Sequence, residues 1–342
     1  MTLELPVLRL GLAGFSAGQQ DDLATALGAV GAGVVHWEIS ELDHADAWWV
    51  NGARVQELGD NRLRIGAGTP NARALQLHLP DVDRPIAFSQ PIETRHFQPL
   101  YSFDPESLGS QAAVLRRFEA WLAPTVAQFF LAAHIVEHET ALRSGVFDLT
   151  HNGSVIAVVS MHGETAVLPT AAPSDFEDAV WGREPAETEI PEHFVRASMS
   201  QLMWQYAVRT QHDVLPRHYR TGLLYFRRAP RVAQRVLRDS HLLLLRELAR
   251  GPATFDMLQQ NCGFGEDQLA HDLAALYFVG SITSNPRRAA RPPIRIAGSA
   301  EADSSADSQH LPSGLDSVPP TARERKQLAD HDLTAPAPIG PH

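Results

Sequence analysis

The sequence predicts an α/β domain over residues 5–95, an α+β domain over 110–230, a helical unit over 231–285 and a disordered tail over 286–342. Three observations lead to this division. Apolar runs alternate with helical spacing in the first segment, an Asn-Gly turn divides two apolar runs in the second, and helical spacing dominates the third. The tail is mainly Pro, Ser, Ala and charge, so it buries too little apolar surface to offset the entropy of ordering.

The first segment contains short apolar runs, and a helical pattern follows the first of them. That helix is expected over 21–30, where apolar residues recur on one face. Continuous apolar runs alternating with helices favour a mostly parallel sheet covered by helices on both faces. The expected strands cover residues 8–15, 34–39, 47–50 and 84–92.

The second segment begins with an apolar helix over 111–142, in which Pro124 marks a break or a new first turn. Asn152-Gly153 is typical of a hairpin turn, and His162-Gly163 marks a second turn, so an antiparallel meander follows the helix. Its expected strands cover 145–149, 155–159 and 165–168. Residues 171–192 are expected to form a connecting loop, and helix returns over 195–210.

The third segment has the pattern of a compact helical unit. Apolar residues recur at helical spacing in three stretches, and a short apolar strand follows the last of them. The expected helices cover 232–250, 255–260 and 266–278, and the strand covers 280–283.

Charge and cysteine content exclude several classes of protein. Lys and Arg total 29 against 40 Asp and Glu, for a formal charge of -11, which excludes a surface coated in positive charge for nucleic acid. The one cysteine, Cys262, excludes a disulfide framework and a Cys-rich metal site, and it fits a reducing compartment. The first residues lack the pattern of a signal peptide, and no uninterrupted apolar run is long enough for a membrane span. We therefore expect a cytoplasmic protein without a membrane span.

Two short motifs resemble catalytic sites. Ser16 lies in a G-x-S-x-G pattern between a strand and a helix, as a hydrolase nucleophile would, but no Asp or His is singled out as its partner. His134 and His138 fit H-x-x-E-H, the inverted zincin motif, but no Glu stands where the third zinc ligand is needed. We interpret Ser16 as part of a small-residue turn and the two histidines as a polar helix face. No catalytic residue, metal or cofactor is therefore expected.

The first domain resembles the receiver domain of response regulators. The segment from Asp46 to Asn51 fits the third receiver strand, with Asn51 in the place of the phosphoacceptor Asp. Gln90 and Pro91 stand in the place of the Lys-Pro that ends the last receiver strand, and Phe15 with Ser16 replaces the acidic pair after the first strand. The resemblance implies a flavodoxin-like pseudo-receiver that performs no phosphoryl transfer. The stretch 59–80 does not align with a receiver, so a helix there is degraded or missing.

The following part resembles the regulatory domain found at the N-terminus of PatA-type response regulators. The matching order is an apolar helix, Ser144-Gly145, the turn Asn152-Gly153, and then His162-Gly163 before the next strand. Residues 239–283 look like the winged-helix-type unit that often closes such proteins. These resemblances imply a signalling protein without its own catalysis, of a kind often tied to surface motility or pili.

Arginines cluster near the start of the helical unit. On a helix Arg231, Arg235 and Arg238 share one face, and Arg228 lies just before them. The cluster is either an anion site, for DNA phosphate or a nucleotide second messenger such as a cyclic dinucleotide, or a solvated helix face. Both interpretations stay open.

Three function hypotheses follow from the sequence. The first is a non-catalytic signalling adaptor that binds protein partners. The second is a DNA-binding transcriptional regulator that uses the winged-helix-like unit, and the third is an enzyme, either a hydrolase at Ser16 or a metallopeptidase. The helix over 266–278 would be the recognition helix, but it carries acidic residues and no Lys or Arg, so the adaptor ranks above the DNA binder. The partner and the oligomeric state are not determined by the sequence.

Overall fold

The computed structural model describes residues 4–30, 33–70, 73–92, 97–142, 144–161, 163–185 and 188–290. All of them belong to one compact unit, Met1–Pro293. Most of the expected tail, from residue 291 onward, lies outside the described residues, as does the expected domain end at residue 95. Residues 286–290 are described and contain a short 3₁₀ turn, η5, Pro286–Arg288.

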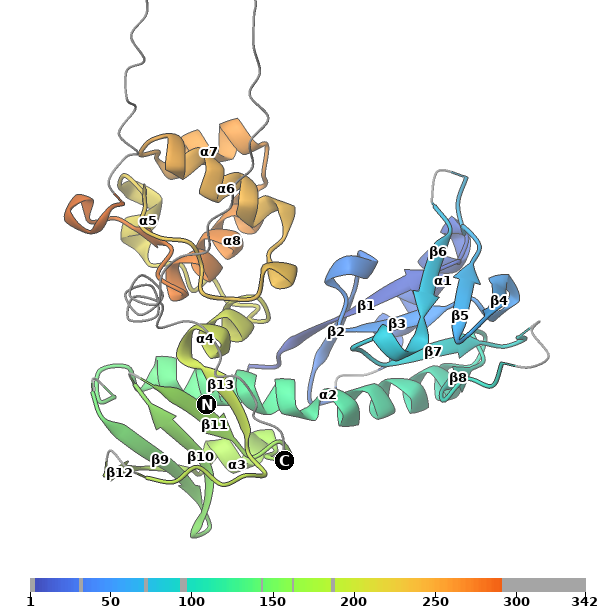
Figure 1. The fold of residues 1–342 in the computed structure, drawn as a ribbon, viewed down its shortest axis with the longest axis horizontal. Helices are drawn as coiled ribbons and strands as arrows, with labels where there is room; N and C mark the ends of the chain where they lie inside the picture. The colour runs from blue at the N-terminus through green and yellow to red at the C-terminus, as the bar shows by residue number, and fades with distance from the viewer. Residues whose placement is uncertain are drawn as a thin grey trace, which may run out of the picture. The chain divides into compact units, whose positions relative to one another are not determined.

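The first domain contains a five-stranded sheet in which every neighbouring pair of strands is parallel. Its order is β2-β1-β3-β7-β8 (Figure 1). This confirms a mixed α/β fold with a parallel sheet. The strands are β1 Val7–Ala13, β2 His36–Ser40, β3 Ala47–Val50, β7 Ile86–Ser89 and β8 Ser102–Phe103.

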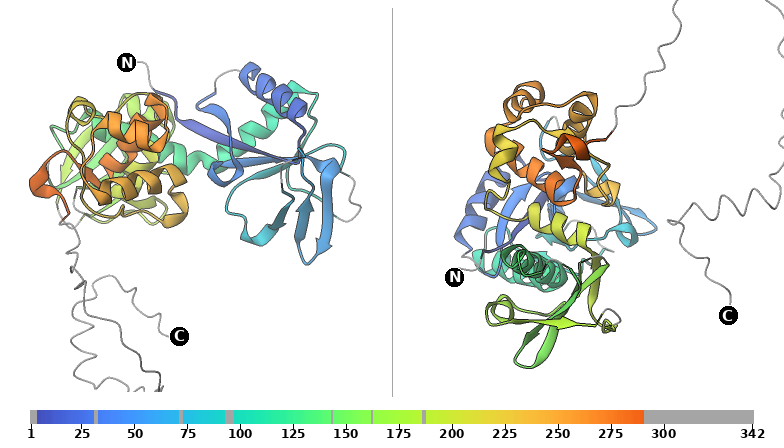
Figure 2. Two further views of the ribbon diagram at one scale, coloured as in Figure 1. Left: turned by 90° about the horizontal axis from the view of Figure 1, so that it is seen from above. Right: turned by 90° about the vertical axis from the view of Figure 1, so that its left-hand side faces the viewer.

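Helices cover only one face of the parallel sheet. Helix α1, Ala17–Ala29, and the first half of α2, Leu108–Glu137, pack on that face, where Trp49 and Phe118 are buried. The other face is covered by the antiparallel sheet β4-β5-β6, so the expected second helical layer is wrong (Figure 2). Its alternating burial, with Leu63 and Ile65 inward, suits a strand and not a helix. The strands are β4 Val55–Gly59, β5 Arg62–Ile65 and β6 Leu75–His78.

Helix α2 contributes to two hydrophobic cores. It has 30 residues and is therefore about 45 Å long. Its first half packs on the parallel sheet and its second half on a second sheet, where Phe129 and Phe130 are buried. The helix continues through Pro124, so the expected break there is wrong. Burial of Leu122 and Val126 on either side of Pro124 offsets the missing backbone hydrogen bond.

By length and hydropathy alone, α2 is the one helix in the described part of the chain that could cross a membrane. Core helices of other proteins also meet this criterion. Phe118, Phe129 and Phe130 are each at most 1% exposed, so these three aromatic side chains of α2 are packed within the chain.

The second sheet is antiparallel, with the order β12-β9-β10-β11-β13. The expected three-stranded meander is confirmed, and Asn152 and Gly153 both have positive φ in its first turn. His162 of the second turn lies outside the described residues. The strands are β9 Val146–His151, β10 Ser154–Ser160, β11 Glu164–Val167, β12 Val180–Glu184 and β13 Val195–Ser198.

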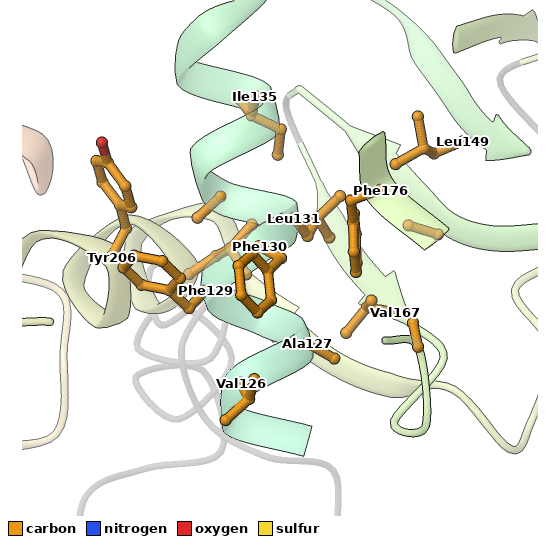
Figure 3. Packing of buried hydrophobic residues seen from close by; sticks show 14 of the residues in the cluster. Val126, Ala127, Phe129, Phe130, Leu131, Ile135, Leu149, Val167, Phe176 and Tyr206 are labelled. Carbon is orange, nitrogen blue, oxygen red and sulfur yellow. The ribbon is translucent and has the colours of Figure 1, made fainter. Parts of the chain in front are cut away.

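The two outer strands of this sheet differ from the expectation. Strand β12 lies in the segment expected to be a loop, and β13 lies at the start of the segment expected to be helix. The short helix α3, Pro173–Glu177, and α4, Met199–Ala207, flank these strands. Phe130 of α2, Phe176 of α3 and Tyr206 of α4 enter the core beside the sheet (Figure 3).

The C-terminal helices form a further core with α4. Helices α7, Phe255–Cys262, and α8, Glu266–Phe278, confirm the expected elements, but α6 spans only Asp239–Arg250. Residues 232–238 contain the 3₁₀ turn η4, Gln234–Val236, so the expectation of helix from residue 232 is wrong. Strand β14, Tyr225–Phe226, pairs with β15, Ile282–Thr283. Helix α5, Arg217–Thr221, precedes β14 in the chain. The unit therefore begins before the expected boundary at residue 231.

Candidate functional site

Asn51 lies at the carboxyl end of β3, in the middle of the parallel sheet, and is 6% exposed. Its Nδ2 donates to the carbonyl oxygen of Gly14 at 3.1 Å, and its Oδ1 accepts from the backbone N–H of Ala53 at 3.1 Å. Both polar atoms of the side chain therefore serve the local backbone. An amide that holds two turns together has a structural role at the carboxyl end of β3.

The turn after β1 packs closely against the connection that follows β5. Phe15 is 1% exposed, so its side chain belongs to the core. Gly68, in the connection after β5, lies against the Phe15 backbone so closely that a Cβ built on it would stand 1.8 Å from the Phe15 carbonyl oxygen. Only a glycine permits this contact. The connection after β5 is thus fixed against the turn that follows β1.

Ser16 is the N-cap of α1. Its Oγ accepts from the backbone N–H of Gln19 at 3.4 Å, and the Gln19 side chain accepts from the Ser16 backbone N–H at 3.0 Å. This reciprocal capping satisfies the start of the helix. No histidine hydrogen-bonds to Ser16 in the described residues, so the hydroxyl has no base to activate it.

Gln90 and Pro91 follow β7, and the peptide bond between them is cis. The strand β8 lies outside β7 in the same parallel sheet, so Gln90 ends the penultimate strand and not the last one. The expectation that Gln90 and Pro91 end the last strand of the sheet is therefore wrong. Ser89 accepts from the backbone N–H of Gly52 at 3.1 Å, which ties the ends of β3 and β7 together.

A hollow of about 440 Å³ lies at this edge. Gln19, Asn51 and Gln90 line it with amides, and Arg54 and Glu106 are its charged lining residues. Arg54 donates to the backbone of Ala67. A single carboxylate among amides does not make the paired acidic site that Mg²⁺-assisted phosphoryl transfer requires.

The histidines of the H-x-x-E-H motif are occupied by hydrogen bonds. Nε2 of His134 lies 3.1 Å from the carbonyl oxygen of Phe176, and its Nδ1 accepts from the indole N–H of Trp181 at 3.0 Å. Nδ1 of His138 lies 2.9 Å from the carbonyl oxygen of His134. Burial is the main cause that lowers the pKa of His134. No metal-binding group of three or more His, Cys, Asp or Glu occurs in the described part of the chain.

The expected arginine cluster divides into two groups. Arg235 lies in η4 and Arg238 at the N-cap of α6, so they do not form a helix face with Arg231, and that expectation is wrong. Arg228 does not line the cleft of Arg235 and Arg238, and it donates to the carbonyl oxygen of Val279 at 3.2 Å. Burial, and then repulsion from Arg231 and Arg227, lowers the pKa of Arg228.

Arg235 and Arg238 instead line a cleft of about 390 Å³ with three arginines that lie far away in the sequence. These are Arg9 of β1, Arg84 before β7 and Arg209 after α4. Sequence reasoning missed them because no spacing connects them. The one available signal was Arg9, a charged residue within an apolar strand.

No family model matches the chain, and no curated protein or solved structure matches it either. The function is therefore argued from the parallel-sheet edge, the C-terminal helices and the arginine cleft themselves.

Proposed function

We propose that the chain is a cytoplasmic, non-catalytic signalling adaptor whose first domain is a pseudo-receiver. The parallel order β2-β1-β3-β7-β8 supports this, because it is the 2-1-3-4-5 order of flavodoxin-like sheets, with β7 and β8 as the fourth and fifth strands. In such sheets the functional edge lies at the carboxyl ends of the strands. Asn51 lies at that edge, after the central strand.

The observation that carries the proposal is a pair of hydrogen bonds: Asn51 donates to the carbonyl oxygen of Gly14 and accepts from the backbone N–H of Ala53. A carboxamide is not the acceptor of a receiver, which is a carboxylate, and it supplies no charge to hold Mg²⁺. The sheet has the strand order of a receiver, but this edge lacks the carboxylates that phosphoryl transfer requires. Such a domain acts through the shape and contacts of its surface.

Phosphoryl transfer is tested on the full chain with acetyl phosphate and Mg²⁺, followed by intact-mass measurement. We expect the mass to remain that of the unmodified chain. A stoichiometric adduct that hydroxylamine removes would contradict the proposal. An active receiver treated in parallel shows that the phosphodonor is competent.

Protein contacts are supported by apolar residues on two edge strands. Ile39 on β2 is 38% exposed, and Val180 on β12 is 66% exposed; both strands end their sheets. An edge strand with exposed apolar residues can pair with an extended segment of another protein. Tagged full chain is compared with the Ile39→Lys and Val180→Lys variants for co-purified proteins, and each complex is rebuilt from purified components. Val155→Lys, at a 40% exposed residue of the interior strand β10, is the matched control.

We further propose that the middle part is a PatA-type regulatory domain and that the last unit is winged-helix-like. The winged-helix-like assignment is supported by the helix order α6, α7, α8. It is also supported by the backbone bridge between Leu224 and Ala253, which extends the β14-β15 pair.

The unit departs from the winged-helix pattern in its wing. Within the described residues after Thr283 the chain makes a 3₁₀ turn and no further strand, whereas a wing needs a strand at this place.

The DNA-binding alternative is disfavoured by the burial of α8. Seven of its residues are buried, and they include consecutive residues from Asp272 to Leu276, so little of the helix is free to enter a groove. Its exposed first turn carries Glu266 and Asp267, which phosphate repels. Titration of duplex DNA at two salt concentrations tests this alternative. A nanomolar, sequence-selective complex at physiological salt would place the DNA binder first.

A further inference from the structure

The arginine cleft carries an unusual charge. Its lining contains five arginines and three aspartates, Asp43, Asp46 and Asp83, so it has an excess of two positive charges. The whole chain has a formal charge of -11. A local positive excess in an acidic protein needs a cause beyond solubility, because acidic residues are abundant enough to neutralise it.

Two of these cations are held inside the protein. The Arg209 side chain is 8% exposed and pairs with Asp46, but its Nε atom has no hydrogen-bond partner within the described residues. Arg9 donates through Nη2 to the carbonyl oxygen of Val208 at 2.7 Å. Burial, and then repulsion from Arg238 and Arg209, lowers the pKa of Arg9 to about 10. Burying cations with incomplete neutralisation is costly for folding, and perturbed buried charges of this kind cluster at functional sites.

Arg238 is a cation of the cleft with free hydrogen-bonding capacity among the described residues. It is half-buried, and its guanidinium group forms no hydrogen bond or ion pair to any residue that the structure describes. Its charge acts on the surrounding groups. Burial, followed by repulsion from Arg238, lowers the pKa of His44, which lines the same cleft. The cleft therefore has a positive potential and a free fork of N–H donors.

An aromatic residue lines the cleft as well. Trp121 of α2 is 49% exposed, although most other large apolar residues of this helix are buried. Leu122, Val208 and Val236 add apolar surface. An exposed indole beside several guanidinium groups offers a stacking surface next to an anion site.

We propose that this cleft binds a phosphate monoester that carries a planar ring, of the size of a mononucleotide. A phosphate dianion matches the excess of two positive charges, and Arg238 offers unused N–H donors to its oxygens. The ring stacks on Trp121. The volume of about 390 Å³ is within the range of small-ligand sites. The proposal does not depend on the adaptor function, because it rests on the cleft and not on the parallel-sheet edge.

Calorimetric titration of the full chain tests the site, with AMP, GMP, ribose 5-phosphate and inorganic phosphate as probes. We expect saturable binding of AMP or GMP that is at least tenfold tighter than binding of inorganic phosphate. Arg238→Ala should weaken nucleotide binding by about tenfold or more, since a charged hydrogen bond is lost. Trp121→Ala should weaken AMP or GMP by about fivefold or more and leave ribose 5-phosphate unchanged.

The matched control is Arg246→Ala, which removes an arginine that is 60% exposed on the same helix, α6, but outside the cleft. It should bind as the wild type does. If Arg238→Ala fails to fold, Arg235→Ala replaces it, because Arg235 is 78% exposed and lies in the cleft. The proposal is overturned if neither nucleotide saturates the protein at millimolar concentration. It is equally overturned if a folded cleft variant binds as the wild type does, or if Arg246→Ala loses as much affinity as the cleft variant.

Discussion

Asp46 and Arg209 form an ion pair across 163 residues of sequence, with Oδ1 and Nη2 2.5 Å apart. The other carboxylate oxygen of Asp46 accepts the backbone N–H of Arg9 at 2.9 Å. The two paired side chains are 14% and 8% exposed. One carboxylate therefore connects strand β1 with the chain that leaves α4.

We predict that Asp46→Asn and Arg209→Met each lower the free energy of unfolding by about 3 kcal/mol, since each leaves one buried group without its partner. The double variant should lose clearly less than the sum of the two single losses. Urea unfolding measures all three. The exposed pair of Glu164 and Arg196, with side chains 62% and 50% exposed, is the control, and Glu164→Gln should cost under about 1 kcal/mol. Strictly additive losses at Asp46 and Arg209 would show that the pair is not coupled.

Two glycines of the first domain should respond in opposite directions to alanine. Gly68→Ala places a Cβ 1.8 Å from the Phe15 carbonyl oxygen and should lower stability by about 1–3 kcal/mol or more. Gly28 lies within α1 and has no atom within 4 Å of the added Cβ, so Gly28→Ala should raise stability by about 0.5–1 kcal/mol. Thermal and urea unfolding of both variants check the pair. A neutral Gly68→Ala would mean that the connection does not close over Phe15.

Phe130 of α2 is 1% exposed and lies between two other rings, with centroids 5.6 Å from Phe129 and 5.9 Å from Phe176. Phe130→Ala should lower the free energy of unfolding by about 3–5 kcal/mol, because it removes a buried ring and leaves a cavity. Leu108, 50% exposed at the start of the same helix, is the control, and Leu108→Ala should cost about 0.5 kcal/mol or less. Equal losses at both residues would place α2 outside the core.

Stability should fall with acid through His271. Burial, and then repulsion from Arg9, lowers the pKa of this histidine below its ordinary value of 6.5. Below pH 6.5 the unfolded chain binds a proton that the folded chain does not, so stability decreases until the pH reaches the folded pKa. Above pH 6.5 the group has no effect. The expected loss is about 1.4 kcal/mol for each pH unit within that window.

His271→Gln should flatten this part of the stability profile, measured by urea unfolding between pH 7.5 and 5.5. Ala270→Gly, at a buried residue of the same helix, controls for destabilisation without titration and should keep the wild-type slope. A His271→Gln protein with an unchanged slope would assign the acid sensitivity to other groups.

Local patterns in the sequence determined much of this protein. Helices α7 and α8, the turn at Asn152-Gly153 and the first parallel strands follow from spacings of a few residues, and the structure has them where the sequence predicts them. Such spacings act through contacts between near neighbours, so one sequence is enough to see them. The lone cysteine and the presence of an amide residue at position 51 could be noted in the same way.

Tertiary structure alone decided the remaining features. The antiparallel sheet over the parallel one, the edge strands β12 and β13, and the passage of α2 through Pro124 all depend on what packs against those segments. The arginine cleft depends on it most, because Arg9, Arg84, Arg209 and Arg238 come from separate elements. A helical or strand period relates residues only within one element. Side chains from different elements meet when the elements bury their apolar faces together, and that packing sets the charge of the cleft.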